Sequence, residues 1–168
     1  MEDEDAPPAL PPGPIYMTPT GQARLADELE QRRTERHRVV EIVSWAASNG
    51  DRSENADYKE GKRRLREIDR RLRYLNTRLA NAEVVDPVIQ TRRDQVFFGA
   101  TVTYATEAGE EHTVTIVGAD EADMAAGTIS IASPIALALL RARTGDEVTV
   151  RTPRGPERIE VLAIAYPN

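Results

Sequence analysis

The sequence predicts an α+β protein in which a long helical hairpin precedes a small sheet domain. Residues 18–82 repeat apolar side chains at alternating steps of three and four, which is the spacing of a coiled coil. Residues 96–168 instead contain short β-rich stretches separated by turn residues, with one helical segment led by a proline. We therefore expect an antiparallel coiled coil followed by a small antiparallel-sheet domain with one short helix.

Composition excludes several classes of site. The chain of 168 residues has no cysteine, so disulfides, thiolate metal sites and cysteine nucleophiles are excluded, which is compatible with a cytoplasmic protein. With only two histidines, a histidine-rich metal site is not expected. No stretch approaches the roughly 20 apolar residues of a membrane span, and no glycine-rich phosphate loop is present. We expect neither a membrane nor a small-molecule substrate as a partner.

The net charge of -6 is an average over unlike segments. Residues 1–14 contain four acids, five prolines and no base, which predicts a disordered tail over residues 1–15. Residues 15–82 contain 15 bases and 11 acids, whereas residues 83–168 contain 7 bases and 13 acids. Nine of the bases fall within residues 59–78, so the chain has a local basic stretch despite its acidic total.

The first predicted helix begins near Thr20 as N-cap and ends at Asn49-Gly50, two residues that tolerate the left-handed conformation. Arg32 and Arg36 occupy seam positions, so we expect them to extend past the apolar surface or to pair with acids on the facing helix. The seam residues are Leu25, Leu29, Arg32, Arg36, Val39, Val43 and Ala46.

The second predicted helix is of similar length and follows a short connection. These two features predict an antiparallel hairpin over residues 16–84, with its tip at residues 49–57. The second seam consists of Tyr58, Gly61, Leu65, Ile68, Leu72, Leu75, Leu79 and Ala82.

Residues 85–95 are predicted to be a linker, and residues 96–168 a second domain. Ser133-Pro134 fits an N-cap followed by proline at the first helical position, so a short helix is expected over Ile135–Arg141. The predicted strands are Val96–Tyr104, His112–Val117, Thr128–Ile131, Glu147–Thr152 and Arg158–Tyr166.

The predicted tip carries three carboxylates, on Asp51, Glu54 and Asp57. Asp51 and Glu54 are three residues apart and can approach one point, as ligands of Mg²⁺ or as groups that orient a water for attack on a phosphodiester. The same spacing is also a capping box for the second helix, with Asp51 as N-cap and Glu54 at the third position. Two carboxylates hold Mg²⁺ weakly, so the metal interpretation requires further ligands from another molecule.

The basic stretch of the second helix fits contact with RNA or DNA phosphates. The alternative is a solvated helix face paired with acids of the first helix, namely Glu28, Glu30, Glu35 and Glu41. Trp45 adjoins a seam residue, so it is interpreted as packing at the seam edge rather than as a platform for stacking bases. The basic residues are Lys59, Lys62, Arg63, Arg64, Arg66, Arg70, Arg71 and Arg73.

Four segments together resemble one known family, the bacterial GreA/GreB transcript cleavage factors. The tip segment Trp45–Tyr58 resembles the tip signature of the family, and Lys62–Leu75 resembles the second helix of its GreB branch. Val96–Ala100 and Ile129–Leu140 resemble parts of its C-terminal domain. The resemblance covers residues 16–166.

The resemblance implies a mechanism shared with bacterial RNA polymerase. An FKBP-like C-terminal domain would dock at the rim of the secondary channel through Phe97, Ser133, Pro134 and Ile135. The coiled coil would enter the channel and bring Asp51 and Glu54 to a Mg²⁺ ion shared with the polymerase active centre, which then cleaves backtracked RNA. Ser53, Asn55 and Asp57 would support the tip, and Lys59, Lys62, Arg63, Arg64, Arg66, Arg70 and Arg71 would contact the nascent RNA 3′ end.

On this basis the protein is expected to be no nuclease by itself and to bind no metal in isolation. The alternative is a non-catalytic regulator that occupies the channel and inhibits transcription. A third interpretation is a peptidyl-prolyl isomerase, which the few aromatics of residues 96–168, Phe97, Phe98, Tyr104 and Tyr166, do not favour.

Overall fold

The computed structural model describes residues 14–49 and 55–168. These residues form two compact units, Ala23–Asn81 without residues 50–54, and Pro14–Gln22 together with Ala82–Asn168. The predicted disordered tail lies, up to residue 13, outside the described residues. None of the helices in the described ranges is long and apolar enough to cross a membrane.

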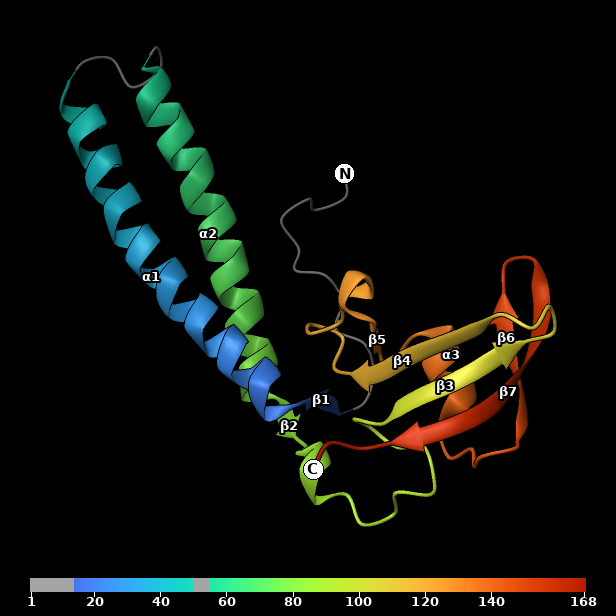
Figure 1. Cartoon of the computed structure of the whole chain (residues 1–168). Helices are drawn as coiled ribbons and strands as arrows, with labels where there is room; N and C mark the ends of the chain where they lie inside the picture. Colours follow the sequence, from blue (N-terminus) through green and yellow to red (C-terminus); the bar gives the residue numbers. More distant parts are fainter. Residues whose placement is uncertain (1–13, 50–54) are drawn as a thin grey trace. The chain divides into compact units, whose positions relative to one another are not determined.

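The first unit is a hairpin of two long helices, α1 (Pro19–Ser48) and α2 (Ala56–Ala80). They run side by side in opposite directions (Figure 1). Contacting pairs confirm this register, because Ala46 contacts Asn55 near the tip and Glu28 contacts Arg71 farther along both helices. Ala46 of α1 and the α2 residues Ile68 and Leu75 are buried, as the predicted seam requires.

At the seam position Gly61, α1 and α2 pack so closely that there is no space for a larger side chain. Gly61 is buried, and a Cβ atom at this position would lie 2.5 Å from Cγ2 of Val43. A glycine inside a helix costs about 1 kcal/mol relative to alanine. Its presence here therefore reflects packing between the helices rather than helix propensity.

The first helix begins two residues earlier than predicted. Thr18, not Thr20, occupies the position before the helix, and its Oγ1 accepts a hydrogen bond of 3.0 Å from the backbone N–H of Gly21. Pro19 follows at the first helical position, where its missing N–H has no intrahelical partner to lose. The prediction of Thr20 as N-cap is therefore wrong, and the Thr18-Pro19 dipeptide was the signal that identifies the true start.

In the second unit, two short strands that the sequence did not predict form a parallel pair. They are β1 (Ile15–Met17) and β2 (Ala82–Val84), with Ile15 opposite Ala82. The backbone N–H of Val85 extends the pair by donating to Met17 O at 2.9 Å. A short 3₁₀ helix, η1 (Pro87–Ile89), follows within the predicted linker. Strands of three residues whose partners are far apart in sequence leave no periodic signal.

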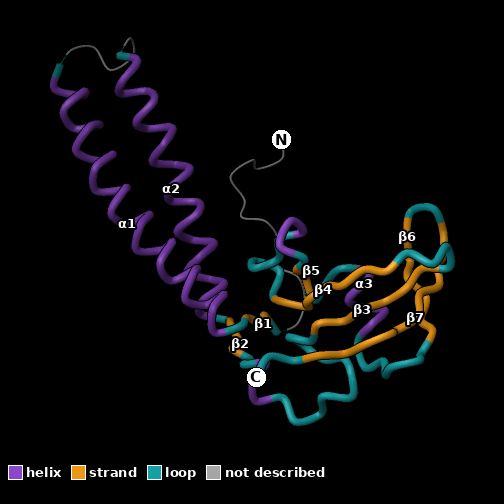
Figure 2. The backbone as a smooth tube through the Cα atoms, in the orientation of Figure 1, coloured by secondary structure: helices purple, strands orange, loops and turns teal. Residues whose placement is uncertain are grey.

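The main sheet has five strands in the order β5-β4-β3-β7-β6 (Figure 2). Neighbouring strands are antiparallel except β4 and β5, which are parallel, so the sheet is mixed rather than fully antiparallel. A longer connection containing η2 (Met124–Ala126) joins β4 to β5 and allows the chain to return in the same direction. The strands are β3 (Thr101–Thr106), β4 (Glu111–Val117), β5 (Thr128–Ser130), β6 (Glu147–Thr152) and β7 (Gly155–Ala165).

The first predicted strand of this domain is shorter than expected. Val96–Ala100 is not extended strand, and β3 begins at Thr101 because Gly99 has a φ of +87°, in the left-handed region. A Cβ at Gly99 would also lie 2.5 Å from Cγ of Pro87. Both the backbone conformation and the close approach of Pro87 require glycine here.

The short helix α3 (Pro134–Leu139) starts as predicted. Ser133 is its N-cap and accepts a hydrogen bond of 3.3 Å from Ala136 N, with Pro134 in the first turn. Ala136 and Leu139 are fully buried and pack into the core of the sheet. The other buried members of this core include Val96, Val102, Ile116, Val150 and Val161.

Glu121 anchors the start of α1 within the second unit. Its carboxylate accepts hydrogen bonds of 3.0 Å from the backbone N–H of Thr18 and of 3.0 Å from that of Gly118, and a third from the Thr18 hydroxyl. A carboxylate near a helix N-terminus is stabilised by the helix dipole. Glu121 thereby fixes the first turn of α1 to the connection that follows β4.

Candidate functional site at the hairpin tip

The tip acids that carry the predicted chemistry, Asp51 and Glu54, lie outside the described residues, as does Ser53. The flanking residues nevertheless decide one open question. The N-cap of α2 is Asn55, whose backbone is extended (φ -86°, ψ 105°) and whose side chain accepts from Tyr58 N. The capping-box interpretation of Asp51 and Glu54 is therefore wrong, because the N-cap lies four residues after Asp51 and is another side chain, that of Asn55.

Asn55 uses both ends of its side-chain amide. Its Oδ1 accepts a hydrogen bond of 3.1 Å from Tyr58 N, and its Nδ2 donates one of 2.7 Å to the backbone oxygen of Ala46. Ala46 belongs to the last turn of α1 and is fully buried. Asn55 therefore caps α2 and ties it to the end of α1, which fixes the spacing of the two chain ends that residues 50–54 connect.

Asp57, the third predicted tip carboxylate, lies in the first turn of α2 and is exposed. An acid in this position is stabilised by the positive end of the helix dipole. Across residues 14–49 and 55–168, no three or more histidine or acidic side chains are grouped so that they could hold a metal ion. The described part of the tip thus offers a single carboxylate.

Three arginines of the basic stretch are engaged in ion pairs along the hairpin. Arg71 binds Glu28 of α1 through two nitrogens, with Nε–Oε2 at 2.8 Å and Nη2–Oε1 at 2.7 Å. Arg64 bridges Glu35 of α1 and Glu67, and Arg63 pairs with Glu60 and Glu67 of its own helix. The alternative of pairing with acids of the first helix therefore holds for Arg64 and Arg71. Arg63 is paired within α2 instead.

Glu35 is at the centre of the network that joins the two helices. Partial burial by itself raises the pKa of its carboxyl, but hydrogen bonds from Arg64 and Arg32 outweigh this effect and lower the pKa below its ordinary value. The Arg64 Nε–Glu35 Oε1 distance is 2.8 Å, and the Arg32 Nη1–Glu35 Oε2 distance is 3.1 Å. This carboxylate therefore favours the folded hairpin while it is ionised.

Of the two seam arginines, only Arg36 pairs with the facing helix as expected. Arg36 pairs with Asp69 of the facing helix, with an Nε–Oδ1 distance of 2.7 Å, which confirms pairing across the seam. Arg32 pairs with Glu35 on its own helix instead. The weak half of the apolar seam is therefore supplemented by charge pairs.

Four cations of the basic stretch remain exposed and have no ion pair with any described residue. At 100° per residue they fall within one narrow sector of α2, nearly opposite the seam residues Gly61 and Ile68. The exposed cations without an ion pair to a described residue are thus fewer than the basic residues of the stretch. We call these four cations the basic stripe, which consists of Lys59, Lys62, Arg66 and Arg73.

Trp45 is not packed at the seam edge, as the sequence was interpreted. Its side chain is 61% exposed, and Ile42, one turn earlier, is 52% exposed. Ala46 alone of this turn is buried. The interpretation was wrong because neighbouring residues of a helix point 100° apart around its axis. Trp45 therefore points away from the seam although the next residue, Ala46, lies in it.

The predicted docking residues of the second unit fall in two places. Ser133, Pro134 and Ile135 lie at the start of α3, where Ser133 is committed to capping. Phe97 belongs to a segment held at the other end of α3, because Val96 N donates to Ala142 O at 2.9 Å. The N–H of Phe97 itself donates to the hydroxyl of Tyr166 at 2.8 Å.

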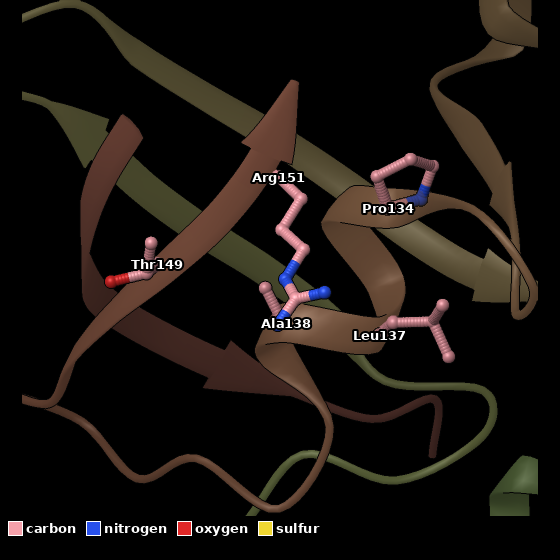
Figure 3. A pocket seen from close by; sticks show the side chains of 5 residues that line it. All are labelled: Pro134, Leu137, Ala138, Thr149 and Arg151. Atoms are coloured by element: carbon pink, nitrogen blue, oxygen red, sulfur yellow. The ribbon is translucent and has the colours of Figure 1, made fainter. Parts of the chain in front are cut away.

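A groove of about 420 Å³ lies between α3 and β6, lined by Pro134, Leu137, Ala138, Thr149 and Arg151. Figure 3 shows the Arg151 side chain extending from β6 toward α3. Leu137 is 62% exposed. Of the predicted docking residues only Pro134 lines this groove. Sequence reasoning missed Leu137 and Arg151, although an apolar residue on the outer side of a short amphipathic helix is a signal that could have identified Leu137.

Comparison with known proteins assigns the chain to a class. The family model described as "Transcription elongation factor, N-terminal" matches residues 15–84, and the model "Transcription elongation factor, GreA/GreB, C-term" matches residues 90–166. The chain belongs to the GreA/GreB family of transcription elongation factors. The resemblance inferred from the sequence is therefore confirmed.

Individual relatives place the chain on the GreB-like branch. It is 56% identical over 152 residues to transcription elongation factor GreB of Neisseria meningitidis serogroup B, covering 90% of this chain and 93% of that one. It is 46% identical to GreB of Pseudomonas aeruginosa, covering 92% of each chain, and 38% identical to GreA of Alkalilimnicola ehrlichii, covering 90% and 98%. Among solved structures, GreA factor homolog 1 of Thermus thermophilus is 26% identical, covers 91% of this chain and 99% of that one, and has a TM-score of 0.43.

Proposed function

We propose that this elongation factor inserts its hairpin into the secondary channel of RNA polymerase and stimulates the polymerase to cleave backtracked nascent RNA. Asp51 and Glu54 would be the residues that act at the RNA, and the second unit would dock on the polymerase through the region of Ser133, Pro134 and Ile135. The tie formed by Asn55 supports this proposal. Because Asn55 caps α2 and joins it to α1, Asp51 and Glu54 are not needed to start the helix and are available for chemistry.

The metal in this proposal would be shared between two proteins. A Mg²⁺ ion bound there would activate water and neutralise phosphate charge. Asp51 and Glu54 supply oxygen ligands of the kind that Mg²⁺ prefers, but two carboxylates are too few to dehydrate it. The only other tip carboxylate in the described ranges is that of Asp57, which lies in the first turn of α2. The remaining ligands must therefore come from the polymerase and from RNA phosphate, and no nuclease activity is expected of the protein alone.

The basic stripe would guide the extruded RNA 3′ end along α2 toward the tip. Lys59 lies one turn into the helix, and Lys62 and Arg66 follow at steps of three and four along the same face. Phosphate contacts of this kind position RNA without reading its sequence. The ion-paired Arg64 and Arg71 would instead hold the two helices together, and Arg63 would stabilise α2 itself.

The deciding experiment is RNA cleavage in a purified backtracked elongation complex. Asp51→Ala and Glu54→Ala should each reduce the cleavage rate by about 10² or more, if each carboxylate acts mainly in the transition state. Glu41→Ala is the matched control, because Glu41 is an exposed carboxylate of α1 and has no ion pair with a described residue. Unchanged cleavage in both tip variants would refute the site assignment. Binding to polymerase with slower transcription and no short RNA products would identify the non-catalytic regulator instead.

A further inference from the structure

The hairpin has two chemically different faces near its tip. Residues 39–48 of α1 contain one charged side chain, Glu41, whereas residues 57–67 of α2 contain eight. On α1 the exposed side chains of this stretch include Ile42 (52%) and Trp45 (61%), which are three residues apart and therefore neighbours on the helix surface. We call these two residues the apolar patch.

Exposure of this size is unusual for a tryptophan. Tryptophan is highly buried on average, and its large ring makes exposure to water unfavourable. A single exposed apolar residue needs no explanation, but a tryptophan beside an isoleucine on a rigid helix is typical of an interaction site. Neither residue contributes to the seam, where Val43 and Ala46 fill the corresponding turn.

The charge around the patch distinguishes between two kinds of occupant. Sites that stack bases of single-stranded RNA combine aromatic rings with a positively charged groove. The nearest charged residues on the same side of α1 are Arg38 and Glu41, one of each sign, so this surface has no net positive charge. The exposed cations instead form the basic stripe on α2, directed nearly opposite to the seam of that helix. The apolar patch therefore suits an apolar protein surface and the basic stripe suits RNA.

We infer that the apolar patch of Ile42 and Trp45 is a second contact surface of the hairpin, which docks on an apolar protein surface of RNA polymerase when the tip is inserted. This inference rests on the proposed function, in which the hairpin enters the polymerase. Within that function, α1 would contact protein and α2 would face RNA. Aromatic anchors of this kind often supply a large share of the energy of an interface. The contact would prevent the hairpin from rotating about its long axis and so fix the direction in which the tip points.

The chain contains a single tryptophan, which makes a direct test possible. The full-length protein is labelled with 5-hydroxytryptophan, which can be excited apart from the tryptophans of the polymerase, and its fluorescence is quenched with acrylamide. We expect efficient quenching in the free protein and a severalfold lower quenching constant on binding RNA-free polymerase. Equal quenching in the free and bound protein would overturn the inference. Protection that appears only when extruded RNA is present would also overturn it and would identify an RNA base as the occupant.

Binding measurements with matched variants complete the test. Trp45→Ala should weaken binding to RNA-free polymerase about tenfold or more, as expected for an interface anchor. Ile42→Ser should weaken it less, and Trp45→Phe should retain part of the affinity. Val40→Ser is the control, because Val40 is an exposed aliphatic residue on the opposite side of α1. Unchanged affinity in Trp45→Ala, with helix content and thermal stability preserved, would overturn the inference.

The failure of this inference can be told apart from failure of the proposed function. If the protein stimulates cleavage but Trp45 stays accessible to acrylamide, only the contact surface is wrong. If the protein does not bind polymerase at all, both are wrong. If Trp45 is protected but Asp51→Ala and Glu54→Ala cleave normally, the contact holds and the catalytic assignment fails.

Discussion

At the scale of single residues, Asn55 connects the stability of the hairpin with the availability of its tip acids. One side chain satisfies an N–H of the first turn of α2 and a carbonyl of the last turns of α1. Both groups belong to helix ends, where backbone donors and acceptors lack intrahelical partners. Because the two hydrogen bonds use different atoms of the amide, substitutions can remove one while keeping the other.

Asn55→Ser should separate the two roles of this residue. Serine caps helices about as well as asparagine, but its shorter side chain cannot span to Ala46 O. We expect Asn55→Ser to lose about 1 kcal/mol of unfolding free energy and Asn55→Ala, which also loses the cap, about 2 kcal/mol. Urea unfolding followed by circular dichroism measures both. If the serine variant is as stable as the wild type, the hydrogen bond to Ala46 contributes nothing.

The spacing of residues in the sequence predicted which side chains near the tip are buried, but not which residue caps α2. The seam spacing correctly identified Ala46, Ile68 and Leu75 as buried. Spacing could not decide between Asp51 and Asn55 as N-cap, because both side chains can cap and only the turn geometry selects one. For Trp45 the spacing was sufficient but was not applied, because a position 100° from Ala46 and 200° from Val43 around the helix lies off the seam.

At the scale of elements, α1 and α2 are held together by close packing near the tip and by ion pairs farther along. The close packing is that of Gly61 against Val43. The ion pairs are those of Glu35 with Arg64 and of Glu28 with Arg71. Exposed ion pairs contribute little individually, but linked pairs on a rigid hairpin set its register. The two mechanisms predict different responses to mutation and to pH.

Gly61→Ala should destabilise the hairpin although alanine favours helices. The gain in helix propensity is about 1 kcal/mol, whereas overpacking costs about 1–3 kcal/mol. Val43 cannot move away easily, because β-branched side chains have one preferred rotamer in a helix. We expect a net loss of about 1 kcal/mol in urea unfolding. Val43→Ala should restore stability in the Gly61→Ala background, and a double-mutant cycle without coupling would contradict the contact.

The lowered pKa of Glu35 predicts how hairpin stability depends on pH. A carboxyl whose folded pKa lies below its unfolded value of 4.5 stabilises the folded state above that value. This stabilisation is lost as the pH falls from about 4.5 through the lower, folded pKa. Glu35→Gln should therefore flatten the fall in melting temperature between about pH 5 and pH 3. Glu41→Gln is the control, and equal slopes in Glu35→Gln and the wild type would contradict the network.

Elements were predictable where they repeat a pattern and not where they depend on distant partners. The two long helices and α3 with its Ser133 cap were predicted as elements, although their exact ends were not. The strand β6 matches the prediction in both bounds. The β1–β2 pair was missed because each strand has three residues and its partner lies at the other end of the hairpin sequence. The late start of β3 was missed because it depends on the conformation of Gly99 and on its contact with Pro87.

At the scale of the whole molecule, the charge is distributed unevenly along the chain, and this underlies the different partners that we propose for its parts. Residues 83–168 have 7 bases and 13 acids, so this part of the chain is expected to bind protein rather than free nucleic acid. The structure narrows the basic stretch to the basic stripe, since several of its arginines serve the hairpin. If the basic stripe contacts RNA, as we propose, that contact depends on few cations, and its salt dependence should be correspondingly modest.

The salt dependence of the complete factor acting on a backtracked complex should distinguish the basic stripe from the ion-paired arginines. Lys62→Gln combined with Arg66→Gln should weaken the apparent affinity for the complex. It should also reduce the slope of log affinity against log salt by about 0.7 for each phosphate contact removed. Arg63→Gln is the matched control, because Arg63 pairs with Glu60 and Glu67 of its own helix, and it should leave the slope unchanged. Cleavage rates titrated with protein at several potassium chloride concentrations measure these slopes. If Arg63→Gln lowers the slope as much as the double variant does, the stripe is not what guides the RNA, because ion-paired and exposed cations would then contribute alike.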